Sequence, residues 1–173
     1  LGVELELPDV VEEQVRDEVR FRIASFGPGG GYVLAPDHNL QDDVPPQNVE
    51  AMFAAALEAF GRVDIVINNA GILRDKSFSN MSEEMWDAVV SVHLKGAYNC
   101  TKPAFDLMKE QKYGRIIFTT SGTGLFGNFG QTNYGAAKAG IAAFTQILAL
   151  EVARYGVTVN AVAPVALTRM TEN

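Results

Sequence analysis

The chain has 173 residues, of which 47% are hydrophobic and 20% charged, and its formal net charge is −7. This length and composition fit one globular domain with a sizeable core and exclude a disordered chain. The negative charge argues against nucleic acid or an anionic membrane surface as a partner.

The absence of recognisable targeting signals and the cysteine usage both favour a cytoplasmic protein. No continuous apolar run approaches the roughly 20 residues that a membrane helix needs, and no signal peptide opens the sequence. Cys100 is the single cysteine, so an internal disulfide is excluded and a reducing compartment is favoured. We therefore expect a cytoplasmic location and no membrane, nucleic-acid or metal partner.

The first elements are a charged helix and a glycine-rich turn. Residues 10–23 have the pattern of a helix, and Gly27-Pro-Gly-Gly-Gly31 follows it and precedes a strand expected at 31–36. The glycines have the wrong spacing for a phosphate loop, which would also follow its strand. We interpret them as a helix stop and turn.

The first 49 residues resemble the C-terminal end of uroporphyrinogen decarboxylase-like proteins. The resemblance is carried by this helix, the Gly-Pro-Gly-Gly-Gly-Tyr-Val-Leu-Ala-Pro run, Asp37-His38-Asn39 and the segment 43–49. The resemblance implies the last strand and helix of a TIM-type barrel, with His38 near the mouth of the active site. Fewer than about 60 residues cannot build an eight-stranded barrel. We therefore assign residues 1–49 as a segment of that kind without its catalytic site, and expect His38 in an exposed loop.

The next elements are a helix and a buried strand. Residues 49–60 are amphipathic and follow two prolines, which suit a first helical turn. Val63–Ile67 is apolar enough for a parallel strand buried on both faces. The strand leads into Asn68-Asn-Ala-Gly71, whose amides can tie neighbouring strands and whose glycine permits close backbone approach.

A long helix is expected from Ser82 to Met108. Ser82 can cap it, and two glutamates follow at its positive end. His93 lies inside this helix, in Val92-His-Leu-Lys-Gly96.

A second strand at 114–120 ends in Ser121, and a glycine-rich loop leads from it into an alanine-rich helix. Tyr134 and Lys138 are four residues apart on that helix, so both project from one face. A phenol is a poor base at neutral pH, and a nearby ammonium favours its phenolate form. The trio suits proton transfer coupled to hydride transfer, although Tyr-x-x-x-Lys alone is common and often only decorates a helix surface.

The same helix carries a small-residue stripe and an apolar stripe that exceed what one sheet face needs. These stripes comprise Ala136, Gly140, Ala143, Ile141, Phe144 and Leu148. A third strand is expected over 157–164.

Four motifs identify residues 50–173 as a member of the short-chain dehydrogenase/reductase family. They are Val63–Gly71, Ser121 thirteen positions before Tyr134, Lys138 four positions after it, and Val157–Pro164. The resemblance implies a partial Rossmann-like, doubly wound parallel sheet that lacks the first glycine-rich βαβ unit. It also implies a NAD or NADP cofactor, a secondary alcohol or ketone substrate, and a homodimer formed through the helix of Tyr134.

The resemblance also assigns the site residues. Catalytic roles fall to Tyr134 as acid/base, Lys138 as its cationic neighbour and ribose contact, and Ser121 as donor to the substrate oxygen. Cofactor contacts fall to Asn68, Ala70, Gly71, Tyr134, Lys138, Pro164 and Thr168. Each asparagine equally suits a purely structural role that pins the sheet.

His93 stands where most members of the family have an asparagine that helps hold a water in the proton relay. With Gly127-Asn-Phe-Gly130 and Arg169-Met-Thr171, it is similar to the hydroxyacyl-CoA dehydrogenase domains of multifunctional β-oxidation enzymes. The resemblance implies that His93 holds the relay water and that the substrate is a 3-hydroxyacyl thioester. A half-buried histidine bonded to backbone is an equal alternative.

Both ends of the chain look cut, because it starts at Leu1 and stops at Asn173, soon after the last motif. We expect a fragment or chimera of two α/β proteins. Three functions stand open: an oxidoreductase, a catalytically incomplete module that at most dimerises, and a barrel-family decarboxylase or methyltransferase. The absent pyrophosphate loop favours the second over the first.

Overall fold

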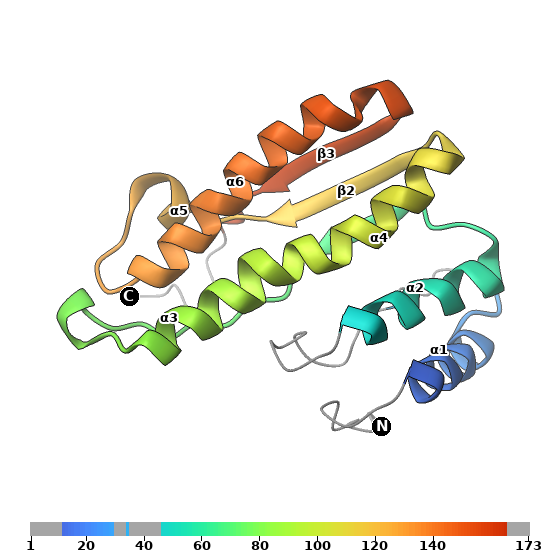
Figure 1. The fold of residues 1–173 in the computed structure, drawn as a ribbon, viewed down its shortest axis with the longest axis horizontal. Coiled ribbons are helices and arrows are strands. Elements are labelled where there is room, and N and C mark those ends of the chain that lie inside the picture. The colour runs from blue at the N-terminus through green and yellow to red at the C-terminus, as the bar shows by residue number, and fades with distance from the viewer. Residues whose placement is uncertain (1–11, 30–33, 35–45, 166–173) are drawn as a thin grey trace.

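Figure 1 shows the chain in a computed structural model, which describes residues 12–29, 34 and 46–165. Two helices come first, α1 (Glu12–Phe26) and α2 (Pro46–Phe60), and they lie side by side. Arg16 and Arg20 of α1 form ion pairs with Glu58 of α2, at 2.9 and 2.8 Å. Both helices confirm the predictions over residues 12–23 and 49–60, and positions 10 and 11 lie outside the described residues.

The helix stop after α1 is also as predicted. The N–H of Gly27 donates to the carbonyl oxygen of Ile23 at 2.8 Å, and Gly29 has φ +92°, a conformation that favours glycine. The strand predicted at 31–36 lies outside the described residues except for position 34. His38 and Thr168 lie outside them as well.

Three parallel strands form the sheet, in the order β1 (Ile65–Asn68), β2 (Gly114–Thr119) and β3 (Val157–Val162). Ile65 pairs with Arg115 at one end and Asn68 with Phe118 at the other, and β2 runs in register with β3 over its whole length. All three strands fall where the apolar runs predicted them. The α/β class and the partial Rossmann-like parallel sheet are therefore confirmed.

The helices of the sheet layer cover one of its faces. Figure 1 shows α4 (Gly96–Gln111) and α6 (Thr132–Val152) on the same side, and both contact the strands. Fully buried side chains between them form the core, namely Ala104, Met108, Ile116, Phe118 and Val152, each 0% exposed. Their burial supplies the hydrophobic stabilisation of this layer.

The opposite sheet face is open in the described part of the chain. Ile65 and Ile67 of β1 are 58% and 60% exposed, whereas Val66 between them is 8% exposed. The prediction that β1 is buried on both faces is therefore wrong for the structure described. Side chains alternate between the two faces of a strand, and the described helices that contact this sheet cover only the face of Val66.

The long helix predicted from Ser82 to Met108 consists of three consecutive pieces. They are α3 (Glu83–Val90), a π-helical turn (Ser91–Lys95) and α4. Ser82 is the N-cap, as predicted, and its hydroxyl accepts from the N–H of Met85 at 3.3 Å. The π-turn contains His93, and such turns are frequent at functional sites.

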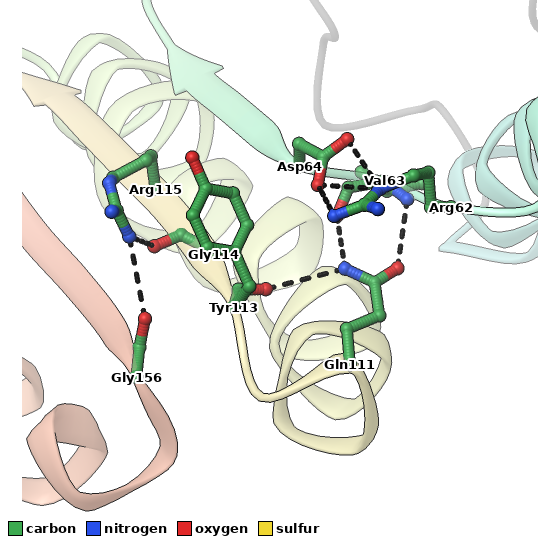
Figure 2. Close-up of polar contacts among 8 residues, drawn as sticks. All are labelled: Arg62, Val63, Asp64, Gln111, Tyr113, Gly114, Arg115 and Gly156. Carbon is green, nitrogen blue, oxygen red and sulfur yellow. Dashed lines mark hydrogen bonds and ion pairs between the residues drawn. The ribbon is translucent and has the colours of Figure 1, made fainter.

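The amino ends of the strands are joined by side chains, as Figure 2 shows. Gln111, at the end of α4, accepts from the N–H of Val63 at 3.0 Å and donates to the carbonyl of Val63 at 2.8 Å. It also donates to the carbonyl of Tyr113 at 3.3 Å. Arg115 donates to the carbonyls of Gly114 and Gly156, at 2.7 and 3.4 Å. These bonds fix the starts of the three strands relative to one another.

The apolar stripe of α6 packs largely within the chain. Ile141 and Leu148 are 2% and 9% exposed, and a Cβ added to Gly140 would lie 3.1 Å from Leu94. The interpretation that the apolar stripe exceeds the needs of the sheet is therefore wrong for Ile141 and Leu148. Ala136 and Ala143 of the small-residue stripe are exposed, so its role in a subunit contact stays a prediction. The large apolar side chains of α6 that stay exposed are Ile147 and Leu150, at 58% and 83%.

Within the described residues, one stretch could cross a membrane by length and composition alone. It covers Thr132–Tyr155, has a mean hydropathy of 1.3, and 28% of its apolar window is buried. The stretch includes α6, which packs on β2 and β3 and holds Lys138 in a buried position. A core helix passes the same test, so this is weak evidence for a membrane span.

Candidate active site

The predicted catalytic side chains lie at the carboxyl edge of the sheet, where ligands bind in open α/β folds. Ser121 follows the end of β2 and is the N-cap of the short helix α5 (Gly122–Phe126), with its hydroxyl accepting from the N–H of Thr123 at 3.2 Å. A Cβ added to Gly124 would lie 2.7 Å from backbone atoms of Lys138 and Ala139. The absence of a side chain at this position lets α5 lie directly against the turn of α6 that carries Lys138.

Lys138 is buried, with 4% of its surface exposed. Its Nζ donates to the carbonyl oxygen of Thr119 at 2.6 Å and lies 5.6 Å from the centre of the Tyr134 ring. The hydroxyl of Thr120 donates to the carbonyl oxygen of Lys138 at 2.7 Å. Burial lowers the pKa of the Lys138 ammonium from 10.5 to about 8. A cation is therefore held beside the phenol by two residues at the end of β2.

His93 contacts the other side of this group. Its ring lies at 85° to the ring of Tyr134, with the centroids 5.2 Å apart, and 4% of the residue is exposed. Nε2 lies 2.8 Å from the carbonyl oxygen of Ile72 and 3.1 Å from the N–H of the same residue. The shorter contact favours the tautomer in which Nε2 donates to the carbonyl, and this leaves Nδ1 with a lone pair.

Nδ1 of His93 is the one buried side-chain nitrogen or oxygen without a hydrogen-bond partner in the described part of the chain. Burial lowers the pKa of His93, and the charge of Lys138 lowers it further, whereas the bond to Ile72 raises it. These effects favour a neutral imidazole at neutral pH. A neutral ring with a buried lone pair can accept a hydrogen bond from a ligand or a water.

Gly71 permits this placement of the histidine. A Cβ added to Gly71 would lie 2.4 Å from Cε1 of His93, a distance that would force one of them to move. The close approach that the glycine predicted therefore occurs, and the group it approaches is the His93 ring. No sequence signal linked these two positions, which are 22 residues apart.

The two asparagines after β1 make structural bonds. Nδ2 of Asn68 donates to the hydroxyl of Thr101 at 3.1 Å, which ties β1 to α4. Oδ1 of Asn69 accepts from the hydroxyl of Thr119 at 2.8 Å, which ties the ends of β1 and β2. The prediction that these amides tie neighbouring strands is confirmed for Asn69, whereas Asn68 ties its strand to a helix. Cofactor contacts of Asn68 and Ala70 stay predictions.

The structure thus brings five predicted site residues to one edge of the sheet: Gly71, His93, Ser121, Tyr134 and Lys138. Pro164 is exposed just beyond β3, and the described residues contain no cluster of His, Cys, Asp or Glu that could hold a metal. Sequence reasoning missed Thr119 and Thr120, which bond to Lys138, and Asn133, whose side chain accepts from the N–H of Tyr134. A pair of threonines at the end of an otherwise apolar strand is a signal that could have indicated the first two.

These features define an α/β protein of the Rossmann-like class with a hydroxyl, a phenol and an ammonium at the carboxyl edge of its sheet. The sequence matches the short chain dehydrogenase family over residues 37–173. The chain therefore belongs to the short-chain dehydrogenase family, a family of oxidoreductases that use NAD(P).

Similar proteins include multifunctional enzymes. The chain is 54% identical over 123 residues to the peroxisomal hydratase-dehydrogenase-epimerase of Neurospora crassa, and this match covers 71% of the chain and 14% of that protein. It is 51% identical over 123 residues to the peroxisomal multifunctional enzyme type 2 of Mus musculus, covering 71% and 17%. The chain thus spans less than a fifth of the length of these two relatives.

A smaller relative covers more of the chain. The 3-oxoacyl-[acyl-carrier-protein] reductase of Synechocystis is 45% identical over 152 residues, or 87% of the chain and 60% of that protein. That length exceeds residues 50–173, so the alignment extends into the first 49 residues. The division at residue 49 and the resemblance of the first segment to uroporphyrinogen decarboxylase-like proteins stay predictions.

Proposed function

We propose that the site carries out NAD(P)-dependent oxidation of a secondary alcohol or reduction of a ketone, with a 3-hydroxyacyl or 3-oxoacyl thioester as substrate. The observation that carries the proposal is the buried ammonium of Lys138 beside the Tyr134 ring, next to the buried lone pair of His93. The thioester is supported by the names of relatives, which include a 3-oxoacyl-[acyl-carrier-protein] reductase and an acetoacetyl-CoA reductase.

The residues present suit the nicotinamide ribose. Lys138 has three N–H donors and uses one of them on Thr119, so donors remain for ribose hydroxyls. A nicotinamide bound there would supply the acceptor for a hydride from the alcohol carbon. In this oxidation the deprotonated Tyr134 takes the hydroxyl proton of the alcohol. The alcohol thereby loses two electrons and two hydrogens and becomes a ketone.

The other side chains have distinct tasks in this scheme. Ser121 donates its hydroxyl hydrogen to the substrate oxygen, since its oxygen accepts from Thr123 and its proton is free to turn outward. Lys138 stabilises the deprotonated phenol by charge. His93 accepts a hydrogen bond at Nδ1 from a water that passes protons from Lys138 toward solvent. The cofactor would lie between the turn after β1 and the segment after β3. The first contributes Asn68, Ala70 and Gly71, and the second contributes Pro164 and Thr168.

The experiment pairs calorimetric binding of NADH and NADPH with a turnover assay on alcohols and hydroxyacyl thioesters. We expect micromolar binding that survives Tyr134→Phe and weakens in Lys138→Ala. Turnover in Tyr134→Phe should fall by roughly 10²–10⁴-fold, the usual contribution of general acid–base catalysis. Tyr113→Phe, an exposed tyrosine at the amino end of β2, is the matched control and should leave turnover unchanged. A folded chain that binds neither nucleotide contradicts the proposal.

A second candidate function is that of a dimerising module without turnover. An open apolar depression between the π-turn, α4 and α6 favours it, lined by Val90, Leu94, Lys95, Tyr98 and Phe144. Leu150 extends the apolar surface on α6. We propose a homodimer through this face in either case, and a cytoplasmic location. Analytical ultracentrifugation at micromolar concentration should show a dimer that Leu150→Glu converts to monomer, and a monomeric wild type would exclude the interface.

A further inference from the structure

Asn133, the residue before Tyr134, is completely buried although its side chain is polar. Its Nδ2 donates to the carbonyl oxygens of Arg74 and Met85, at 3.1 and 3.0 Å. Its Oδ1 accepts from the N–H of Tyr134 at 2.8 Å. Both amide hydrogens and the amide oxygen are thus paired, which compensates the burial of this group.

These three bonds join three different elements. Arg74 lies in the loop after β1, Met85 lies in α3, and Tyr134 lies in the first turn of α6. The acceptors are 59 and 48 residues from Asn133 in the sequence. N–H groups in the first turn of a helix have no acceptor within that helix. The backbone of Tyr134 is therefore held by a side chain that is itself anchored to two other elements.

The loop after β1 has further attachments on both sides of the Asn133 contact. The N–H of Lys76 donates to the carbonyl of Gly130, and Nε2 of Gln131 donates to Asp75, each at 2.8 Å. His93 bonds to the backbone of Ile72 at the other end of the loop. Within this group, Asn133 supplies the bond that ends on Tyr134 itself.

We propose that Asn133 is a positioning residue, which sets the Tyr134 ring relative to His93 and to the loop that carries Gly71. The kinetic part of this inference rests on the proposed function, whereas the placement of the ring does not. An aspartate at this position has nearly the same shape and keeps an acceptor for the Tyr134 N–H. It would, however, place a carboxylate oxygen against two carbonyl oxygens, and their repulsion would break the attachment.

Nuclear magnetic resonance of the His93 ring tests the placement directly, because the chain has only two histidines, His38 and His93. The Tyr134 ring lies edge-on to His93, so its ring current shifts the His93 signals. Asn133→Asp should move these signals by an amount comparable to Tyr134→Leu. Asn160→Asp is the matched control, since Asn160 is exposed on β3, and it should leave them in place.

Kinetics on the same proteins separates positioning from stability. Misplacing a catalytic group by about 1 Å can cost roughly 10²-fold in rate, so kcat of Asn133→Asp should fall steeply while KM for the substrate stays nearly constant. A wild type without turnover whose His93 signals still move in Asn133→Asp refutes the proposed function and supports the positioning. Unmoved His93 signals in a folded Asn133→Asp protein overturn the positioning.

A measurement on the unmodified chain covers the case in which Asn133→Asp does not fold. The Tyr134 amide should exchange with deuterium far more slowly than an unpaired first-turn amide, because Asn133 holds its hydrogen. Exchange at the rate of a free amide would overturn the inference. Asn133→Ser, which is smaller and uncharged, is the second variant for the ring-current measurement.

Discussion

Replacement of Lys138 by methionine should change how the stability of the chain depends on pH. The folded chain holds the Lys138 pKa at about 8 because the ammonium is buried, whereas an unfolded lysine titrates near 10.5. Between these values the unfolded chain binds a proton that the folded chain has lost. The free energy of unfolding contributed by this group therefore rises with pH across that window. Methionine has a similar length and no proton to lose.

The magnitude follows from the two pKa values. Integrating the difference in bound protons from pH 7 to pH 10 gives a gain of about 2.5 kcal/mol for the wild type, at about 1.4 kcal/mol per pKa unit. Cys100 has the opposite effect, because burial raises the pKa of its thiol to about 11. Its contribution to the free energy of unfolding therefore falls as the pH rises. Both proteins keep Cys100, so the comparison between them removes its effect.

The assay is urea unfolding of wild type and Lys138→Met at pH 7 and at pH 10. From pH 7 to pH 10 the free energy of unfolding of the wild type should rise by about 2 to 3 kcal/mol relative to that of the variant. Loss of the bond to Thr119 adds an offset that is the same at both pH values and cancels. Lys102→Met, at an exposed position, is the control and should track the wild type. If the difference in unfolding free energy between wild type and Lys138→Met is the same at both pH values, burial does not lower the pKa of Lys138.

Two further substitutions test the geometry around the site. Gly71→Ala should lower the free energy of unfolding by about 1–3 kcal/mol, because its Cβ would overlap the His93 ring. Gly122→Ala, where a Cβ meets nothing within 4 Å, should be nearly neutral in the same urea titration; equal effects would contradict the overlap. Thr101→Val removes the acceptor of Asn68 from a buried site and should cost about 1–3 kcal/mol. Thr158→Val, on the open face of β3, is its control, and two neutral variants would show that the bond does not stabilise the fold.

Much of the fold was predictable because it depends on local patterns. The apolar runs of β2 and β3 and the amphipathic helices follow directly from residue order. The four-residue spacing of Tyr134 and Lys138 placed both side chains on one helix face. These features need no knowledge of distant contacts.

The remainder depends on partners that are far apart in the sequence. Asn133 acquires its role from carbonyl groups 48 and 59 residues away, and no local pattern identifies them. The close packing of Gly71 against the His93 ring likewise joins residues that no local sequence pattern connects. The open face of β1 was missed because a strand that is apolar on both faces gives the same pattern whether or not a helix covers it.

The π-turn at Ser91–Lys95 has a consequence for the helix as a whole. Its hydrogen bond runs from the N–H of Gly96 to the carbonyl of Ser91, five residues back, so it accommodates one residue more than an α-helical turn. One residue corresponds to a rotation of about 100°. The inserted residue thus acts as a phase shift, which lets α3 present one side to α6 while α4 presents another to β1 and β2. Deleting a single residue there would rotate Thr101 and Met108 away from the sheet, although neither residue would itself have changed.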